Sequence, residues 1–544
     1  MNEREFDAIV IGGGPAGSTA ATMLARKGRR VLLLERDRFP RDHVGESLLP
    51  ASMPLFEELG VLPAIEAAGF LRKWGAVMVW GKDPEPWSWY FRETNRRYPH
   101  SFQVWRARFD QILLENSRAQ GVDVREGCRV LEVMFDGDRA TGVRYACEDG
   151  ERTIGARFVV DASGQTGLIG RSLGLRRADP YFRNLAVYGY FTGAEQVPAP
   201  DESNIFIESY PDGWCWTIPL HTGWTSVGVV TDSRRAQQEM QRAGHESYFR
   251  EQIGQALHTA HRLRAATLVS GPVVVRDWSY VSDEVVGDGF ILSGDAACFV
   301  DPLFSSGVHL ALSSGILAAA YVHTALDHPE MREPAGKVYK ELYYRQYGHF
   351  RELAKLFYSS NRSVDSYFWE ARRILGADQS ESPRHSFIQA VAGQPVQGYE
   401  RAVLERGDAP RGFAEGVRAI ESDRELRRSH VDAALINSAD VEILRRLVPQ
   451  LEPGAKLERK PVLGDGEFVW GYTLTTRGNP EGLPVSTLVA SAVALIDGQR
   501  SVADLLAELS RDFTGVEGDK IAAAIVPALR ILYVDGAIAA MDGL

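Results

Sequence analysis

Two tryptophans one residue apart point most directly to chemistry in this 544-residue chain. Residues 214–219 read Trp-Cys-Trp-Thr-Ile-Pro. Because side chains i and i+2 of a strand point to the same face, Trp214 and Trp216 are predicted to form one aromatic wall. Pro219 has no N–H to donate to a ladder, so it is predicted to end that strand. Large aromatic side chains also fill ordinary cores, so this segment alone leaves a purely structural role open.

A glycine-rich turn near the N-terminus has the spacing of a dinucleotide-binding fingerprint. Residues 12–17 read Gly-Gly-Gly-Pro-Ala-Gly between a predicted strand and a predicted helix, and a second strand ends at Glu35. Gly12 would permit the tight turn, Gly14 would let the backbone approach a pyrophosphate, and Gly17 would let the helix pack on the strand. The helix N-terminus favours phosphate, and an acid at Glu35 favours FAD or NAD over NADP.

The composition is that of an ordinary globular protein, with 44% hydrophobic and 24% charged residues. A formal net charge of −11 argues against nucleic acid as a partner. The four cysteines are widely spaced without a CxxC pair, which argues against a metal site and a disulfide framework and favours a reducing cytoplasm. No signal-peptide layout is seen, and the uncharged stretch Pro302–Leu326 is rich in Ser, Gly and Ala, which predicts a buried helix rather than a membrane span.

The rest of the chain divides by its periodicity and its turn residues. Residues 75–105, rich in aromatic side chains, and the alternating residues 180–285 indicate antiparallel strands of a second sheet. Residues 376–459 are more polar and are expected to form helices joined by loops. Residues 460–544 predict a small α/β unit in which Ser501 caps a helix.

These motifs together resemble the para-hydroxybenzoate-hydroxylase-like flavoproteins, over roughly residues 5–370. Besides the glycine turn, the resemblance rests on Arg106 before Phe-Asp, on Asp161 in Val-Val-Asp-Ala-Ser-Gly and on Asp295 in Ser-Gly-Asp. In that family the Gly-Asp aspartate typically contacts the flavin ribityl chain.

Within that family the chain resembles the FAD-dependent halogenases. Three features carry the resemblance: the complete Trp214-x-Trp216-x-Ile-Pro signature, the segment Phe299–Gly307, and Lys73 in Arg-Lys-Trp-Gly-Ala, after Gly-Glu-Ser. The local sequence around Lys73 is similar to that of the family members that act on phenols and pyrroles.

The resemblance implies an α/β fold with three parts. The first is a Rossmann-like FAD-binding halogenase core over residues 1–375, interleaved with an antiparallel substrate-side sheet over about 75–105 and 180–285. A helical extension over 376–459 and a small C-terminal unit over 460–544 follow. The order of elements in that unit, helix, helix and hairpin, loosely resembles winged-helix domains that bind peptides or carriers.

The resemblance also implies a reaction. Reduced FAD, O2 and chloride or bromide yield hypohalous acid, which travels inside the protein to an electron-rich ring. Lys73 would hydrogen-bond this oxidant or form a haloamine, although a lysine is by default exposed. Ser306 and Gly307 would hold the halide just before a helix, where simple helix capping is the other interpretation. Trp214 and Trp216 would separate flavin from substrate.

A wider set of residues is expected to contact the cofactor. Asp277 would hydrogen-bond the flavin or esterify its 8-methyl carbon, unless it is a surface residue of a strand. No second fingerprint for NAD(P)H is present, so a separate flavin reductase is the implied source of FADH2. The expected cofactor residues are Gly12, Gly14, Pro15, Ala16, Gly17, Glu35, Arg36, Arg41, Ser47, Arg106, Val130, Asp161, Asp277, Asp295, Pro302 and Val308.

Three other functions stay open. An aromatic hydroxylase would use the same scaffold with NAD(P)H, and the tryptophan signature and Lys73 argue against it. A flavin-dependent reductase of isoprenoid double bonds shares the fold without these motifs. A non-catalytic protein that binds FAD or docks a carrier is kept open by residues 460–544. For a halogenase, a phenol that is free or tethered to a carrier protein is the leading substrate, and aliphatic or activated-methylene compounds stay open.

Overall fold

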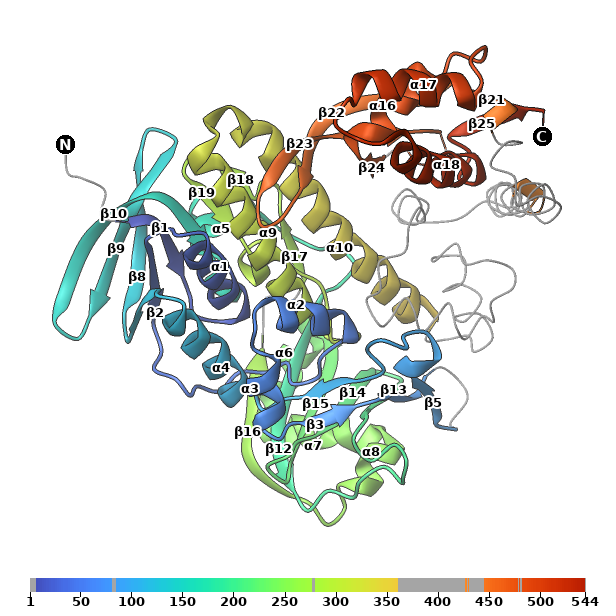
Figure 1. The fold of residues 1–544 in the computed structure, drawn as a ribbon. Coiled ribbons are helices and arrows are strands. Elements are labelled where there is room, and N and C mark those ends of the chain that lie inside the picture. Colours follow the sequence, from blue (N-terminus) through green and yellow to red (C-terminus); the bar gives the residue numbers. More distant parts are fainter. Residues whose placement is uncertain are drawn as a thin grey trace. The chain divides into compact units, whose positions relative to one another are not determined.

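The chain divides into two compact units (Figure 1), Met1–Ala377 with Glu381–Val396, and Asp378–Ser380 with Gln397–Leu544. The computed structural model describes residues 6–80, 85–275, 279–360, 426, 427, 429, 445–477, 479 and 482–543.

The first unit is built on an eight-stranded sheet with the fingerprint at its centre. The main path of the sheet is β18-β19-β10-β1-β2-β7, and β8 and β9 continue from β10. The central strand β1 is parallel to both β2 and β10, so the predicted βαβ unit is confirmed. Figure 1 shows α1 and α4 lying alongside β1 and β2. The elements are β1 (Phe6–Ile11), α1 (Pro15–Arg26), β2 (Val31–Glu35), α4 (Arg106–Ala119), β7 (Asp123–Glu126), β8 (Arg129–Asp136), β9 (Arg139–Cys147), β10 (Gly150–Asp161), β18 (Val286–Gly287) and β19 (Phe290–Leu292).

A second, seven-stranded sheet carries the tryptophan segment. Its order is β16-β12-β15-β14-β13-β4-β5, and its neighbours are antiparallel except β13 and β4, which are parallel. The prediction of an antiparallel sheet is therefore wrong for this one pair. The connection between β4 and β13 passes through much of the first sheet, and such a long crossover allows parallel pairing. The strands are β4 (Gly75–Val79), β5 (Trp87–Tyr90), β12 (Asn184–Thr192), β13 (Ile205–Tyr210), β14 (Gly213–Pro219), β15 (Trp224–Asp232) and β16 (Thr267–Val275).

Short helices cover one face of the second sheet. Apolar side chains of β12, β14 and β15 pack there with those of α6 (Ser233–Ala243) and α7 (His245–Gln255) in one buried cluster. Cys215 belongs to this cluster, whereas its neighbours Trp214 and Trp216 point to the other face, because side chains alternate along a strand. Because α6 and α7 cover one face of the sheet, the opposite face, which carries Trp214 and Trp216, can line a cavity.

Two long helices complete the first unit. The uncharged stretch forms α9 (Gly307–Asp327), which is long and apolar enough to cross a membrane, but 89% of its apolar window is buried inside the protein. It is therefore a core helix, as predicted. The next helix, α10 (Arg332–Ser360), packs along α9. The hydroxyls of Tyr339 and Tyr343 on α10 donate to the carbonyls of Leu292 and Gly294.

Cys128 and Cys147 form a disulfide, with their Cα atoms 4.3 Å apart. The expectation that the cysteines are unpaired is wrong for these two. They are separated by 19 positions in sequence, but β8 and β9 pair as a hairpin with Arg129 opposite Ala146, which brings the flanking cysteines together. The cysteine spacing therefore no longer supports a reducing compartment.

The C-terminal unit has its own hydrophobic core around α16, α17 and α18. The capping box of Ser501 with Asp504 at the start of α17 is confirmed. Strands precede residue 460 where helices were expected, and the hairpin comes before the helices rather than after them. The four-residue β21 contains a proline and is too short to show alternation, so only its pairing with β25 reveals it as a strand. The elements are β21 (Val448–Leu451), β22 (Lys456–Leu463), β23 (Phe468–Thr475), β24 (Leu483–Val485), α16 (Thr487–Leu495), α17 (Val502–Asp512), α18 (Gly518–Val534) and β25 (Ile538–Asp542).

Candidate active site

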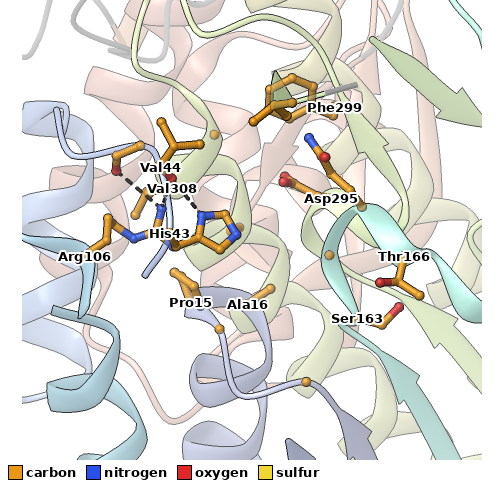
Figure 2. A pocket seen from close by; sticks show the side chains of 18 of the residues that line it. Pro15, Ala16, His43, Val44, Arg106, Ser163, Thr166, Asp295, Phe299 and Val308 are labelled. Carbon is orange, nitrogen blue, oxygen red and sulfur yellow. Dashed lines mark hydrogen bonds between the residues drawn. The ribbon is translucent and has the colours of Figure 1, made fainter. Parts of the chain in front are cut away.

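A cavity of about 460 Å³ lies where the carboxyl ends of β1 and β10 meet the tryptophan face of the second sheet. Figure 2 shows Pro15 and Ala16 of α1, Ser163 and Thr166 after β10, and Asp295 around this space. Ligands of open parallel sheets bind at such strand ends. The predicted residues that line the cavity are Gly12, Gly14, Pro15, Ala16, Glu35, Arg36, Arg41, Ser47, Arg106, Val130, Trp214, Trp216, Asp295, Pro302, Gly307 and Val308.

The glycine turn has the steric properties expected of a dinucleotide cradle. Gly12 has φ +98°, and a Cβ there would lie 2.5 Å from the carbonyl oxygen of Ala162. A Cβ at Gly17 would lie 1.9 Å from the oxygen of Gly12, so only glycine lets α1 pack this closely on the turn. A Cβ at Gly14 would meet nothing nearer than 3.4 Å, which leaves that position open toward the cavity.

Glu35 is buried and faces the cavity from the end of β2. One carboxylate oxygen accepts a 2.6 Å hydrogen bond from the N–H of Gly13, and the other accepts one of 2.8 Å from the N–H of Asp37. The acid therefore holds the glycine turn in addition to facing the ligand space. Together with the uncapped N-terminus of α1, it forms a site for an anionic dinucleotide with a free ribose.

Arg106 braces the loop that closes one side of the cavity. Its guanidinium makes a bidentate ion pair with Asp110, at 2.8 and 2.9 Å. It also donates to the carbonyl of Val44 at 2.7 Å, and Figure 2 shows these two residues beside the cavity. Ion pairing with Asp110 raises the pKa of Arg106 despite its burial. The same loop carries His43 and Glu46, and both line the cavity.

Asp295 is a titratable carboxylate in the cavity wall. Burial raises its pKa to about 6, and the positive charges of Arg106 and Arg176 oppose this shift. The carboxylate is therefore mostly ionised at neutral pH, when it can accept hydrogen bonds from a polyol chain.

Trp214 and Trp216 form the predicted wall. Both are buried, both line the cavity, and their ring centroids are 5.9 Å apart. Gly228 is the cross-strand partner of Trp216, and a Cβ there would lie 2.1 Å from the indole. The missing side chain at Gly228 thus makes the space that Trp216 occupies.

Lys73 lies in the interior, at the end of β3 (Leu71–Lys73), and is only 2% exposed. The interpretation as a surface lysine is therefore wrong. Its Nζ donates to the carbonyl of Leu48 at 3.1 Å and lies 5.5 Å from the centre of the Phe91 ring. Burial lowers the pKa of Lys73 to about 7, so charged and neutral forms coexist near neutral pH. Lys73 does not line the cavity of the glycine turn.

Ser306 precedes the first turn of α9, next to Gly307 in the cavity wall. Its side chain is 1% exposed and does not cap the helix, and its hydroxyl has no hydrogen-bond partner within the described residues. Simple capping therefore does not account for this serine. A buried hydroxyl beside a helix N-terminus suits a small anion.

One predicted cofactor residue is placed differently from the expectation. Asp161 does not line the cavity, because its carboxylate accepts hydrogen bonds from the N–H groups of Ser163, at 3.1 Å, and Ile169, at 2.7 Å. It holds the turn after β10 rather than facing the ligand space. Gly17 does not line the cavity, but it lets α1 pack on the turn as predicted. Asp277 lies outside the described residues.

Several lining residues were not predicted. Ser163 and Thr166 follow the carboxyl end of β10, and the strand pattern could have identified them. His43 and Tyr188 carry no sequence signal, since tertiary packing alone brings them to the cavity. Within the described residues, no group of three or more His, Cys, Asp or Glu side chains is arranged to hold a metal ion.

Comparisons with known proteins agree with this geometry. Residues 92–406 match the tryptophan halogenase family and residues 7–172 match the FAD dependent oxidoreductases. A tryptophan 2-halogenase of Chondromyces crocatus is 39% identical over 377 residues, which cover 67% of this chain and 70% of that protein. A 1H-pyrrole-2-carbonyl-[peptidyl-carrier protein] chlorinase of Pseudomonas fluorescens is 33% identical over 448 residues, which cover 78% of this chain and 96% of that protein.

Solved structures show the same relationship. The myxobacterial chondrochloren halogenase CndH matches with a TM-score of 0.64 and 42% identity, over 74% of this chain and 95% of that one. The flavin-dependent halogenase CmlS matches with a TM-score of 0.70 and 28% identity, over 97% of this chain and 96% of that one. With the cradle, the tryptophan wall and these matches together, the chain belongs to the FAD-dependent halogenases.

Proposed function

We propose that this halogenase chlorinates an electron-rich phenolic ring, free or tethered to a carrier protein, with FADH2 from a separate cytoplasmic flavin reductase. The observation that carries this proposal is the placement of Lys73, which is buried away from the cofactor cavity beside the Phe91 ring. An oxidant formed in the cavity would meet the substrate at such a separate position. The carrier-bound substrate named for the Pseudomonas relative supports the carrier option.

The residues of the cavity fit the cofactor of this family. Gly14 and the N-terminus of α1 would hold the pyrophosphate, Glu35 the ribose and Asp295 the ribityl chain. When bound, the reduced flavin would supply two of the four electrons that reduce O2, and the halide would supply the other two as it becomes hypohalous acid, with water as the second product.

The chain's own residues would divide the remaining tasks. Ser306 and Gly307 would hold the chloride beside the cavity, and the indoles of Trp214 and Trp216 would keep the ring of the substrate away from the flavin. Lys73 would donate hydrogen bonds from its ammonium group to the oxidant and orient it toward the substrate.

The test is a reaction of the FAD-loaded enzyme, reduced without oxygen and then mixed with O2, chloride and a panel of phenols. Each phenol is offered free and as a carrier-protein thioester. Mass spectrometry is expected to show the chlorine isotope pattern on a phenol. Products that carry a new hydroxyl and no chlorine would instead place the enzyme among the aromatic hydroxylases.

Gly228→Ala is expected to lower the yield of chlorinated product several-fold without changing FAD affinity. The added methyl group would collide with the indole of Trp216, which must then move out of the wall. The measurement is the amount of product and of hydrogen peroxide for each flavin oxidised, and peroxide should rise as product falls. Gly155→Ala is the matched control, because a Cβ at this strand position would meet nothing nearer than 3.6 Å. An unchanged product-to-peroxide ratio in Gly228→Ala would contradict the role of Trp216.

A further inference from the structure

We propose that Tyr358, near the end of α10, is a positioning residue that ties the tryptophan wall to the loop before α9. Its hydroxyl joins Asn184 of β12, Trp214 of β14 and Asp301 of that loop. We call these four side chains the Tyr358 junction. The inference rests on the proposed halide-binding role of Ser306 and Gly307.

All hydrogen-bonding capacity of the Tyr358 hydroxyl is used. It accepts from the indole N–H of Trp214 at 2.6 Å and from the amide of Asn184 at 3.1 Å. It donates to the Asp301 carboxylate at 2.9 Å. A phenol has one donor and two acceptor positions, and Asp301 as a carboxylate can only accept, so the direction of each bond is set. Burial and the charge of Asp301 raise the pKa of Tyr358 well above its usual value, which keeps the donor protonated.

Packed aromatic rings shield part of the Tyr358 junction from water, since Trp214 and Asp301 are buried and Tyr358 and Asn184 are half-buried. Phe182 contacts the Tyr358 ring at 5.3 Å between centroids. The adjacent Phe357 lies 4.9 Å from Phe304 and 5.9 Å from Trp80, and the indole of Trp80 donates to the Phe357 carbonyl at 3.1 Å. Because the Trp214 N–H and the Asp301 carboxylate belong to buried residues, losing their shared partner is costly.

The Tyr358 junction connects two walls of the cavity. Trp214 and Asp301 both line it, whereas Tyr358 does not. The other carboxylate oxygen of Asp301 accepts from the N–H of Leu303 at 2.9 Å, and this turn leads directly to Ser306. Tyr358 therefore acts through Asp301 on the halide loop and through Trp214 on the wall, without touching the reacting atoms.

Tyr358→Phe is expected to raise the KM for chloride roughly tenfold and to leave the rate of flavin oxidation unchanged. The change would leave the Trp214 N–H without its acceptor and remove one donor from the buried Asp301 carboxylate. Tyr339→Phe is the matched control, because it removes a buried hydroxyl from the same helix, one that donates to the Leu292 carbonyl at 2.6 Å. Asp301→Asn, which weakens the same bond from the other side, should reproduce the effect if Tyr358→Phe folds poorly.

Two readouts test the proposal. In FAD-free protein labelled with 5-fluorotryptophan, the 19F resonance of Trp214, assigned through Trp214→Phe, is expected to shift in Tyr358→Phe and not in Tyr339→Phe. The KM for chloride is measured with monochlorodimedone, which detects hypohalous acid without the natural substrate.

Each outcome decides a different point. An unmoved Trp214 resonance would show that the Tyr358 junction does not hold the wall and would overturn the proposal. A shifted resonance with an unchanged KM for chloride would overturn the link to the halide loop. Failure of phenol chlorination alone would refute the proposed substrate and leave both readouts intact.

Discussion

Lys73→Met is expected to abolish phenol chlorination and, at the same time, to make the folded protein more stable. Lys73 is 2% exposed, and burial lowers its pKa from 10.5 to about 7, so the folded state binds a proton less readily there than the unfolded state does. A pKa lowering of this size means that the buried, protonated lysine reduces the free energy of unfolding by a few kcal/mol. Methionine fills a similar volume without this cost, but it cannot donate a hydrogen bond to the oxidant.

The sign of the pH dependence follows from the same shift. Between pH 7 and 10.5 the unfolded state holds the proton of Lys73 and the folded state does not, so the lysine's penalty shrinks as pH rises through this window. The stability gained in Lys73→Met should be largest at and below about pH 7 and should decline toward pH 10.5. Chlorination by the unaltered enzyme should fall as pH rises through about 7, because the ammonium form of Lys73, which is proposed to donate the hydrogen bond to the oxidant, loses its proton there.

Denaturant unfolding across this pH range, together with product analysis, checks both parts. Lys337→Met is the control, because Lys337 is exposed and forms a surface ion pair with Glu333 at 2.7 Å. Flavin oxidation and FAD affinity should be unchanged in Lys73→Met. Surviving chlorination, or a loss of stability in this variant, would contradict the assigned role and environment of Lys73.

Gly17→Ala is expected to eliminate FAD binding and to lower the yield of folded protein. The new methyl group would lie 1.9 Å from the backbone oxygen of Gly12, and backbone at the centre of a sheet cannot move aside cheaply. Helix α1 would have to separate from β1, which opens the turn that cradles the pyrophosphate. FAD affinity by fluorescence titration and the midpoint of thermal unfolding give the two measurements.

Gly14→Ala is expected to weaken FAD binding without affecting folding, and it therefore serves as the comparison for Gly17→Ala. Gly14 has φ −70° and ψ −175°, which any residue adopts, and a Cβ there meets nothing nearer than 3.4 Å. The protein should fold normally, while the methyl group occupies space in the cavity and weakens FAD binding by about tenfold. Normal FAD affinity in Gly17→Ala would refute the expected collision between its methyl group and Gly12. A folding defect in Gly14→Ala would refute the expectation that this position affects FAD binding and not folding.

The amino-acid sequence alone determined those features whose interacting residues lie close together along the chain. The βαβ unit places its glycines, its helix and Glu35 within about thirty residues, so spacing alone predicted their geometry. Alternation along β14 predicted that Trp214 and Trp216 share a face, and the capping box at Ser501 is set by four consecutive residues. Such features depend on backbone periodicity, which can be read from any short segment.

Only the tertiary structure decided the features whose partners are distant in sequence. Strand pairing brings Cys128 to Cys147 and sets β13 parallel to β4. The low pKa of Lys73 depends on every group that excludes water from it, and the Tyr358 junction joins residues 57 to 174 positions apart. Burial and long-range hydrogen bonds are properties of the packed chain, and no pattern along the sequence specifies which distant atoms will meet.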